Sequence, residues 1–327
     1  MNSDKNVFLT RPLPQPQVER LQSLFPRFHH NQENRSLTQT ELSKHVKGAD
    51  ALLCLLNDKI DADIIDSAGP QLRIIANYAT GYDNIDIAYA TQRGICVTNT
   101  PDVLTDATAD LAWALLLSVS RRIVEAHEYS VKNRFKGWDP ILLLGGEITG
   151  KTLGIIGAGR IGTAMAQRSR GWNMPVVYYS NKHNETLEGW GAKKAANLED
   201  LLQVADFISL HVPLTVETKY LINRETLALL KPTAYLINTS RGKVIDEQAL
   251  VDYLKNKRIA GAGLDVFENE PEIHTDLKEL PNVVLAPHIG SATTETRTRM
   301  AEMAVDNIVS VLAGNKPPNL VNTEVWK

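Results

Sequence analysis

Short apolar runs alternate with longer stretches of helical periodicity along most of the chain. Runs of this length are typical of strands, and the amphipathic stretches between them are typical of connecting helices. Regular alternation of the two predicts an α/β fold with parallel sheets. The expected strands are residues 51–56, 72–76, 95–98, 151–156, 176–179, 207–210, 234–238, 261–265 and 283–286.

Three stretches have clear helical spacing. Residues 106–129 place apolar side chains on one face after a capping Thr105 or Asp106, which predicts one long helix. Residues 161–168 and 293–312 predict two more helices, and a proline-containing tail follows the last one. We expect that tail to fold back onto the amino-terminal part of the chain.

The length and the order of elements predict two domains. A chain of 327 residues exceeds the usual size of one hydrophobic core. The strands before residue 100 form a first α/β unit, and a second β-α alternation starts near residue 152. We expect a first domain of residues 1–100 and 293–327, and a second domain of residues 101–292.

Composition narrows the classes of partner. A net charge of −3 without a long Lys/Arg run argues against sequence-independent binding of nucleic acid or anionic lipid. The longest apolar stretches, such as residues 111–119, are too short to span a bilayer, and the amino terminus lacks a secretory pattern. We therefore expect a cytoplasmic protein with no nucleic-acid or membrane partner. Cys54 and Cys96 lie in apolar runs, which favours reduced core thiols.

A glycine-rich motif follows one predicted strand directly. Residues 157–162 read GAGRIG, between the strand 151–156 and the helix 161–168. In this setting Gly157 makes a tight turn, Gly159 lets the backbone approach a pyrophosphate, and Gly162 allows close helix-strand packing. The helix amino terminus then binds the phosphates. The alternative, a glycine turn that only packs, is disfavoured by the strand-turn-helix context.

The next strand end bears on the choice of nucleotide. Sites that prefer NAD place Asp or Glu about 20 residues after the glycine loop, against the ribose 2′-hydroxyl. Here Ser180, Asn181 and Lys182 occupy that region and supply no carboxylate. These side chains are suited to donate hydrogen bonds to a 2′-phosphate, which favours NADP(H). NAD(H) remains possible if Lys182 is only a solvated loop cation.

Arg241, Glu270 and His288 are the candidate catalytic residues. Arg241 and His288 each follow a predicted strand, at the edge where open α/β sheets bind ligands. Arginine matches a carboxylate with a planar fork, and histidine exchanges protons near neutral pH. Glu270 is suited to hold the imidazole in one tautomer. Taken singly, each of the three is more often a surface or structural residue. We expect no metal site.

The chain resembles the D-isomer-specific 2-hydroxyacid dehydrogenase family, and most of all its glyoxylate/hydroxypyruvate reductase branch. The resemblance covers nearly the whole length. The motifs that carry it are TGYDNID at 80–86, DATADL at 106–111, GAGRIG at 157–162, HVPL at 211–214, TSRG at 239–242, DVF at 265–267 and PHIG at 287–290.

The resemblance implies a fold and a set of roles. The expected fold is two doubly wound parallel-sheet domains, a Rossmann cofactor domain inserted in a flavodoxin-like substrate domain. Arg241, Glu270 and His288 match the family's catalytic set, with Arg241 and His288 also contacting substrate. Further cofactor-binding positions are Thr108, Arg160, Ile161, Pro213, Thr239 and Asp265, the last on the nicotinamide carboxamide. The turn Ala79, Thr80 and Gly81 is expected to receive the substrate carboxylate.

The expected reaction is reduction of a small 2-keto acid, such as glyoxylate or hydroxypyruvate, to the D-2-hydroxy acid. Leu55 is a candidate for the wall of the substrate side pocket. The family implies a homodimer formed through residues 106–129 and the stretch around Trp138. Trp138 either reaches a neighbouring subunit or packs beneath its own loop.

Two other functions use the same scaffold. A nicotinamide-sensing, corepressor-like binding protein retains the fold and the three candidate residues, since fold does not decide function. The long disordered extensions often used to recruit partners are missing from this sequence. Formate and phosphite dehydrogenases are the second alternative, and no motif here favours them.

Overall fold

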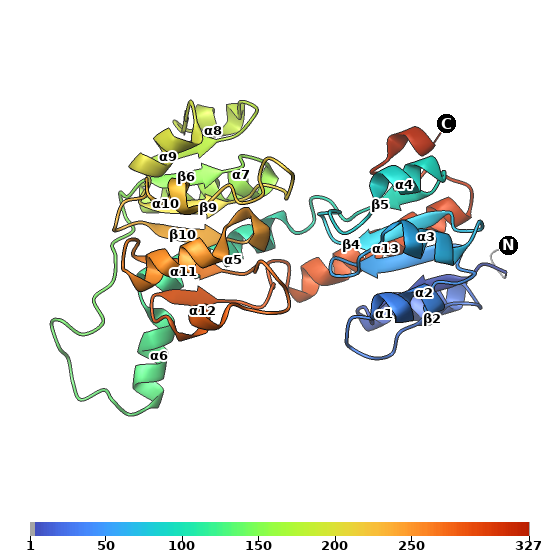
Figure 1. Cartoon of the computed structure of the whole chain (residues 1–327), viewed down its shortest axis with the longest axis horizontal. Helices are drawn as coiled ribbons and strands as arrows, with labels where there is room; N and C mark the ends of the chain where they lie inside the picture. The colour runs from blue at the N-terminus through green and yellow to red at the C-terminus, as the bar shows by residue number, and fades with distance from the viewer. Residues whose placement is uncertain (1–3, 327) are drawn as a thin grey trace. The chain divides into compact units, whose positions relative to one another are not determined.

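The chain forms two compact units in a computed structural model that describes residues 4–326 (Figure 1). One unit contains Met1–Leu104 and Ala292–Lys327, and the other contains Thr105–Ser291. Each unit has one parallel sheet with helices beside it, so the fold is α/β as the sequence predicts.

The first unit is built on a five-stranded sheet. Its order is β2-β1-β3-β4-β5, and every pairing is parallel. This is the flavodoxin-like order, in which the chain winds outward from the middle in both directions. The strands are β1 (Val7–Leu9), β2 (His29–His30), β3 (Ala51–Leu55), β4 (Ile74–Tyr78) and β5 (Cys96–Thr98), and the helices are α1 (Gln15–Leu24), α2 (Gln39–His45), α3 (Ala62–Ala68), α4 (Ile87–Gln92) and α13 (Thr294–Leu312).

The second unit is built on a seven-stranded sheet. Its order is β12-β11-β10-β9-β6-β7-β8, again all parallel. Counted from β6, this is the Rossmann order with one further strand. The strands are β6 (Leu153–Ile156), β7 (Val176–Tyr179), β8 (Lys193–Lys194), β9 (Phe207–Leu210), β10 (Tyr235–Asn238), β11 (Gly261–Leu264) and β12 (Val283–Leu285). The helices are α5 (Thr105–Ser120), α6 (Ile123–Val131), α7 (Arg160–Ser169), α8 (Glu185–Gly189), α9 (Leu198–Val204), α10 (Arg224–Leu227), α11 (Glu247–Lys255) and α12 (Thr275–Glu279).

Strand side chains alternate between two apolar layers in the first unit. Val7 and Leu9 pack with α1 and α13, whereas Phe8 packs with α2 and α3. Because side chains of a strand point to opposite faces in turn, burial on both faces requires nearly continuous apolar runs. The two free cysteines, Cys54 and Cys96, are buried within these layers.

The prediction of one helix over residues 106–129 is wrong. The helix ends at Ser120, and α6 begins at Ile123 after Arg122 adopts a left-handed conformation with φ of 54°. The Ser120 carbonyl accepts a hydrogen bond from Gly146 N at 2.8 Å. A Cβ atom at Gly145 would lie 2.3 Å from that carbonyl oxygen, so a glycine is required where the later segment crosses the helix end.

The tail after α13 continues beside β5. Val321 N donates to Val97 O at 2.8 Å, and Asn322 Oδ1 accepts from Val97 N at 2.8 Å. Leu320 also pairs with Thr98 as an antiparallel bridge. These bonds cover part of an otherwise open sheet edge. Within residues 4–326, no helix is long and apolar enough to cross a membrane.

Candidate active site

The glycine loop joins β6 to α7 as the sequence predicts. Gly157 has φ of 95°, and a Cβ atom there would lie 2.6 Å from His211 O. A Cβ atom at Gly162 would lie 2.1 Å from Gly157 O. At Gly159, by contrast, an added Cβ would meet no protein atom within 4 Å. Two glycines therefore serve packing, and the middle one leaves open space in front of the helix amino terminus.

An open hollow of about 520 Å³ lies in front of this loop. Gly159, Arg160 and Thr163 line it on the side of α7. Asn184 lines it from the segment before α8, and its Nδ2 donates to Ala158 O at 2.9 Å and to Thr163 Oγ1 at 2.8 Å. Asn184 thus ties the loop after β7 to the glycine loop. Ile161 is half-buried in the first turn of α7.

The predicted 2′-phosphate residues lie directly after β7. Ser180 is half-buried, and Asn181 and Lys182 are exposed. Within residues 4–326, no side chain of these three donates or accepts a hydrogen bond. Their donors are therefore free to bind a ligand at the carboxyl end of the strand.

The remaining cofactor candidates lie after neighbouring strands or against them. Pro213 follows β9 and is exposed. Thr239 follows β10, and its Oγ1 is buried without a hydrogen-bond partner in the described chain. Thr108, on α5, packs close to Gly290, since a Cβ atom there would lie 3.4 Å from its Cγ2. An open space before Gly159 and an orphaned hydroxyl at Thr239 both fit a dinucleotide at this sheet edge.

His288 and Glu270 form a close pair. Nδ1 of His288 lies 2.7 Å from Glu270 Oε2, and their side chains are 25% and 29% exposed. Glu270 Oε1 also accepts from Phe267 N at 3.1 Å. Burial opposes ionisation of Glu270, but the hydrogen bond to His288 and the nearby positive charges outweigh it, so its pKa is lowered. Within residues 4–326, Nε2 of His288 has no hydrogen-bond partner.

Asp265 holds the backbone of residues 288–290 through hydrogen bonds. It is 1% exposed, and its carboxylate accepts from Ile289 N at 2.7 Å and Gly290 N at 2.8 Å. Its carbonyl accepts from His288 N at 2.9 Å, which holds His288 at φ of 53°. Burial raises the pKa of Asp265 to about 6, because the two N–H donors and the His288 charge offset it only in part.

Arg241 lies after β10 and contributes to the same group of charges. Its positive charge is one of the causes that lower the pKa of Glu270. Nη1 donates to Ser240 O at 2.8 Å, and Asn238 Nδ2 donates to the Arg241 carbonyl at 2.9 Å. A Cβ atom at Gly242 would lie 1.9 Å from Phe267 O, so this glycine lets the segments of Arg241 and Glu270 approach closely. The structure thus brings the three candidate catalytic residues into one unit.

The predicted substrate residues belong to the first unit. Leu55 is the last residue of β3 and is half-buried. Ala79 is buried, and Thr80 and Gly81 are half-buried in the turn after β4. All four positions lie at the carboxyl ends of adjacent parallel strands, where ligands of such sheets bind.

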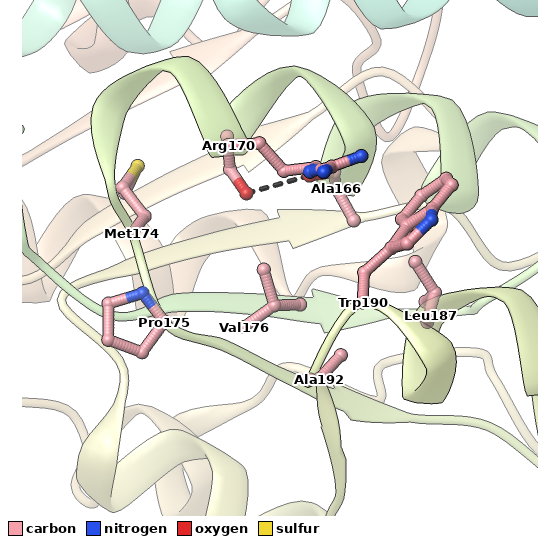
Figure 2. A pocket seen from close by; sticks show the side chains of 10 residues that line it. Ala166, Arg170, Met174, Pro175, Val176, Leu187, Trp190 and Ala192 are labelled. Atoms are coloured by element: carbon pink, nitrogen blue, oxygen red, sulfur yellow. Dashed lines mark hydrogen bonds between the residues drawn. The ribbon is translucent and has the colours of Figure 1, made fainter.

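A smaller hollow of about 80 Å³ lies behind the nucleotide loop, between α7, α8 and β7 (Figure 2). Val176 and Leu187 line it, and Arg170 lies over the Trp190 ring at 5.5 Å. Met174 and Pro175 place this hollow toward the amino end of β7. Ligands of open α/β sheets bind at the opposite, carboxyl end. The open hollow at Gly159 is therefore the better candidate for the cofactor.

Sequence reasoning did not identify Asn184. Its side chain also caps α8 by accepting from Leu187 N at 3.0 Å, and an Asn before a short polar helix is a recognisable capping signal. That signal predicts a helix start and gives no hint of a contact with the glycine loop.

The fold and the site define a two-domain α/β protein with a dinucleotide-binding sheet. Residues 113–290 match the model of the D-isomer specific 2-hydroxyacid dehydrogenase, NAD binding domain. The chain is 50% identical over 325 residues to a glyoxylate reductase of Thermococcus kodakarensis, covering 98% of this chain and 97% of the relative. The chain belongs to the D-isomer specific 2-hydroxyacid dehydrogenase family, as the sequence motifs predict.

Solved structures agree with this assignment. The TT0316 protein of Thermus thermophilus superposes with a TM-score of 0.89 at 45% identity, covering 97% of this chain and 99% of that one. An NADPH-dependent glyoxylate/hydroxypyruvate reductase from Sinorhizobium meliloti, in complex with NADP and malonate, has a TM-score of 0.87 at 33% identity, covering 99% and 98%.

Proposed function

We propose that the protein is a reductase of small 2-keto acids, with glyoxylate or hydroxypyruvate as substrate and NADPH as the preferred reductant. The observation that carries this proposal is the His288–Glu270 pair at 2.7 Å, at the sheet edge that also carries the glycine loop. The names of relatives about half identical to this chain support glyoxylate in particular.

The proposed reaction divides the chemistry among a few side chains. A nicotinamide cofactor bound at the glycine loop would supply the hydride that the carbonyl carbon accepts. His288 donates a proton from Nε2 to the carbonyl oxygen, while Glu270 stabilises the charged imidazole. Arg241 stabilises the negative charge that grows on that oxygen and binds the substrate carboxylate. Asp265 orients the nicotinamide carboxamide.

The other site residues have supporting roles in this proposal. The N–H groups of the turn at residues 79–81 bind the substrate carboxylate, and Leu55 limits substrate size. Thr108, Pro213 and Thr239 contact the cofactor beside the phosphate loop. Arg160 and Ile161 lie against its pyrophosphate.

Glu270→Gln is expected to change the pH dependence of reduction. The pKa of Glu270 is lowered, so it is a carboxylate at neutral pH, and it lies 2.7 Å from Nδ1 of the ring that donates the proton in the proposed reaction. A neutral amide removes that negative charge, and we expect the loss of reduction activity with rising pH to begin at lower pH than in the wild type. The measurement is kcat/KM for glyoxylate from about pH 5 to 9. Glu272→Gln, an exposed neighbour, is the control, and a superimposable Glu270→Gln profile contradicts the role.

Asn181→Asp is expected to shift the nucleotide preference toward NADH. A carboxylate after β7 repels a 2′-phosphate and accepts a hydrogen bond from a ribose 2′-hydroxyl. The ratio of kcat/KM for NADPH to that for NADH should fall by about 10-fold or more, equivalent to roughly 1.4 kcal/mol. Asn181 is exposed, so we expect the substitution to change the stability of the fold only slightly. An unchanged ratio would remove residues 180–182 from the nucleotide site.

The glycines 159 and 162 provide a matched pair. Gly159→Ala adds a methyl group to open space, so we expect normal thermal stability with weaker NADPH binding. Gly162→Ala forces a Cβ against Gly157 O, so we expect a lower melting temperature. Calorimetry for stability and fluorescence titration with NADPH measure the two effects. Normal NADPH affinity of Gly159→Ala would argue that no phosphate approaches this residue.

The proposed function is tested first with the purified protein. Oxidation of NADPH and NADH is followed with glyoxylate and hydroxypyruvate, and kcat/KM is compared for the four pairs. Formate and phosphite with the oxidised nucleotides test the alternative dehydrogenases. Nucleotide binding without turnover on any of these acids would favour the sensing protein.

We also propose the homodimer that the family resemblance implies. We place its contact at residues 123–144, a different range from the expected residues 106–129 with the stretch around Trp138, because much of α5 is buried. No residue of α6 is buried, and this helix and the segment after it stand apart from the sheet of their unit (Figure 1). Trp138 is 85% exposed, so the alternative that it packs beneath its own loop is wrong. Exposed large apolar side chains that are this numerous in one short stretch mark an interaction surface. They are Ile123, Val124, Val131, Phe135, Trp138, Ile141 and Leu144.

The partner that we propose to bind this surface is a second copy of the chain. Light scattering after gel filtration should give twice the mass of 36.2 kDa. Replacing Phe135 and Ile141 by Glu should give a monomer, while Val216→Glu, at another exposed apolar position, should remain dimeric. A monomeric wild type would exclude the interface. A cytoplasmic location of this assembly is part of the proposal.

A further inference from the structure

The turn after β4 has all of its carbonyl groups held by neighbours in the first unit. Across residues 79–81, Thr100 N donates to the first carbonyl at 2.9 Å, Asn99 Nδ2 to the second at 2.7 Å and Asn77 Nδ2 to the third at 2.9 Å. The Thr80 hydroxyl also donates to Thr100 O at 2.8 Å. Two of the three carbonyls are therefore fixed by asparagine side chains that no motif of the sequence had indicated.

Fixing these carbonyls also fixes the N–H groups of the same peptides. In a trans peptide the N–H points opposite to the C=O, so the N–H groups of Thr80, Gly81 and Tyr82 point away from the partners of the carbonyls. Within residues 4–326, none of these three N–H groups donates a hydrogen bond. Successive unpaired N–H groups form an anion-binding surface.

Asn77 also connects the turn to the end of β3. It is 1% exposed, and its Nδ2 lies 3.0 Å from Asn84 Oδ1. Asn84 Nδ2 in turn donates to Leu55 O at 3.1 Å and to Asp58 O at 3.0 Å. One amide network therefore holds both the turn at residues 79–81 and the residue proposed to limit substrate size.

We propose that Asn77 and Asn99 are positioning residues for the substrate carboxylate, because they hold the carbonyls of residues 79–81 so that three N–H groups stay available to an anion. The inference rests on the proposed role of this turn in substrate binding. Neither asparagine contacts the substrate; each acts through the peptide whose carbonyl it holds.

The test replaces the amide donor by an acceptor of the same shape. Asn77→Asp and Asn99→Asp each lose the donor to their carbonyl, so the peptide is free to rotate. We expect the KM of glyoxylate and the inhibition constant of oxalate to rise together by about 10- to 100-fold, the range for a lost hydrogen bond to a charged group. The KM of NADPH should stay within about twofold, since its proposed ligands belong to the second unit.

Asn31→Asp is the matched control. Asn31 is a buried residue of the same unit whose Nδ2 donates to Arg35 O at 3.2 Å. It directly follows β2, which β1 and β3 separate from β4. We expect its glyoxylate KM to match the wild type. An effect through stability alone would lower the melting temperature of Asn77→Asp without changing KM.

The proposal is overturned if folded Asn77→Asp and Asn99→Asp keep the wild-type KM of glyoxylate, or if the KM of NADPH rises equally. If Asn77→Asp does not fold, the half-buried Asn99 decides. If the wild type does not reduce glyoxylate, the proposed function fails separately. Calorimetric titration of oxalate into the NADPH-saturated proteins then tests the positioning role, and equal affinities of wild type and variants would overturn it.

Discussion

His288→Ala should lower the kcat of glyoxylate reduction by about two to four orders of magnitude, which is the range for loss of a general acid-base group. The reason is the arrangement of its ring: Nδ1 is held by Glu270 at 2.7 Å, and Nε2 has no partner among residues 4–326. Only Nε2 is then available for proton transfer. The expected loss corresponds to roughly 3–5 kcal/mol of transition-state stabilisation.

The same variant should bind NADPH normally. The backbone N–H of His288 donates to Asp265 O, a hydrogen bond that the substitution leaves in place, although the φ of 53° at this position is strained for alanine. His288→Asn tolerates that backbone conformation and cannot exchange a proton, so it separates strain from chemistry. His274→Asn, at the start of α12, is the control and should retain activity. Wild-type turnover of His288→Asn would end the acid-base assignment.

The positions of many strands along the chain follow from local patterns, because apolar runs buried on both faces are distinct in this sequence. Their order within each sheet was expected only from the family resemblance. Residues 176–179 and 207–210 are predicted with the bounds they have as β7 and β9. The amino-terminal strands were not predicted. β2 has only His29 and His30, and its strand conformation depends on pairing with β1. No local pattern in the sequence indicates that pairing.

The sequence predicts only those parts of the site in which the type and position of a residue indicate its chemical role. Strand ends identified Arg241 and His288, and the distance of 2.7 Å between His288 and Glu270 accords with the expected partnership. What holds these residues in place was beyond sequence reasoning. The clearance at Gly242 depends on the Phe267 backbone, 25 positions later in the chain, and the contact of Asn184 with Ala158 joins two separate loops.

Arg241→Lys is expected to be almost as inactive as Arg241→Ala. The guanidinium has two roles in the proposed reaction, to bind a carboxylate through a planar fork and to donate to the developing alkoxide. An ammonium supplies charge without that geometry. Loss of one preorganised donor costs about 10²- to 10³-fold in kcat, and weaker carboxylate binding should raise KM in addition.

Comparing Arg241→Lys with Arg241→Ala separates the effect of the positive charge from that of the planar guanidinium group. Steady-state kinetics with glyoxylate should give a kcat/KM for Arg241→Lys within about 10-fold of that for Arg241→Ala, far below the wild type. Arg170→Lys, at the hollow behind the nucleotide loop, replaces the same group outside the site and should leave kcat/KM unchanged. If lysine restored most of the activity, a point charge would suffice at this position. The substrate carboxylate would then depend chiefly on the N–H groups of the turn at residues 79–81.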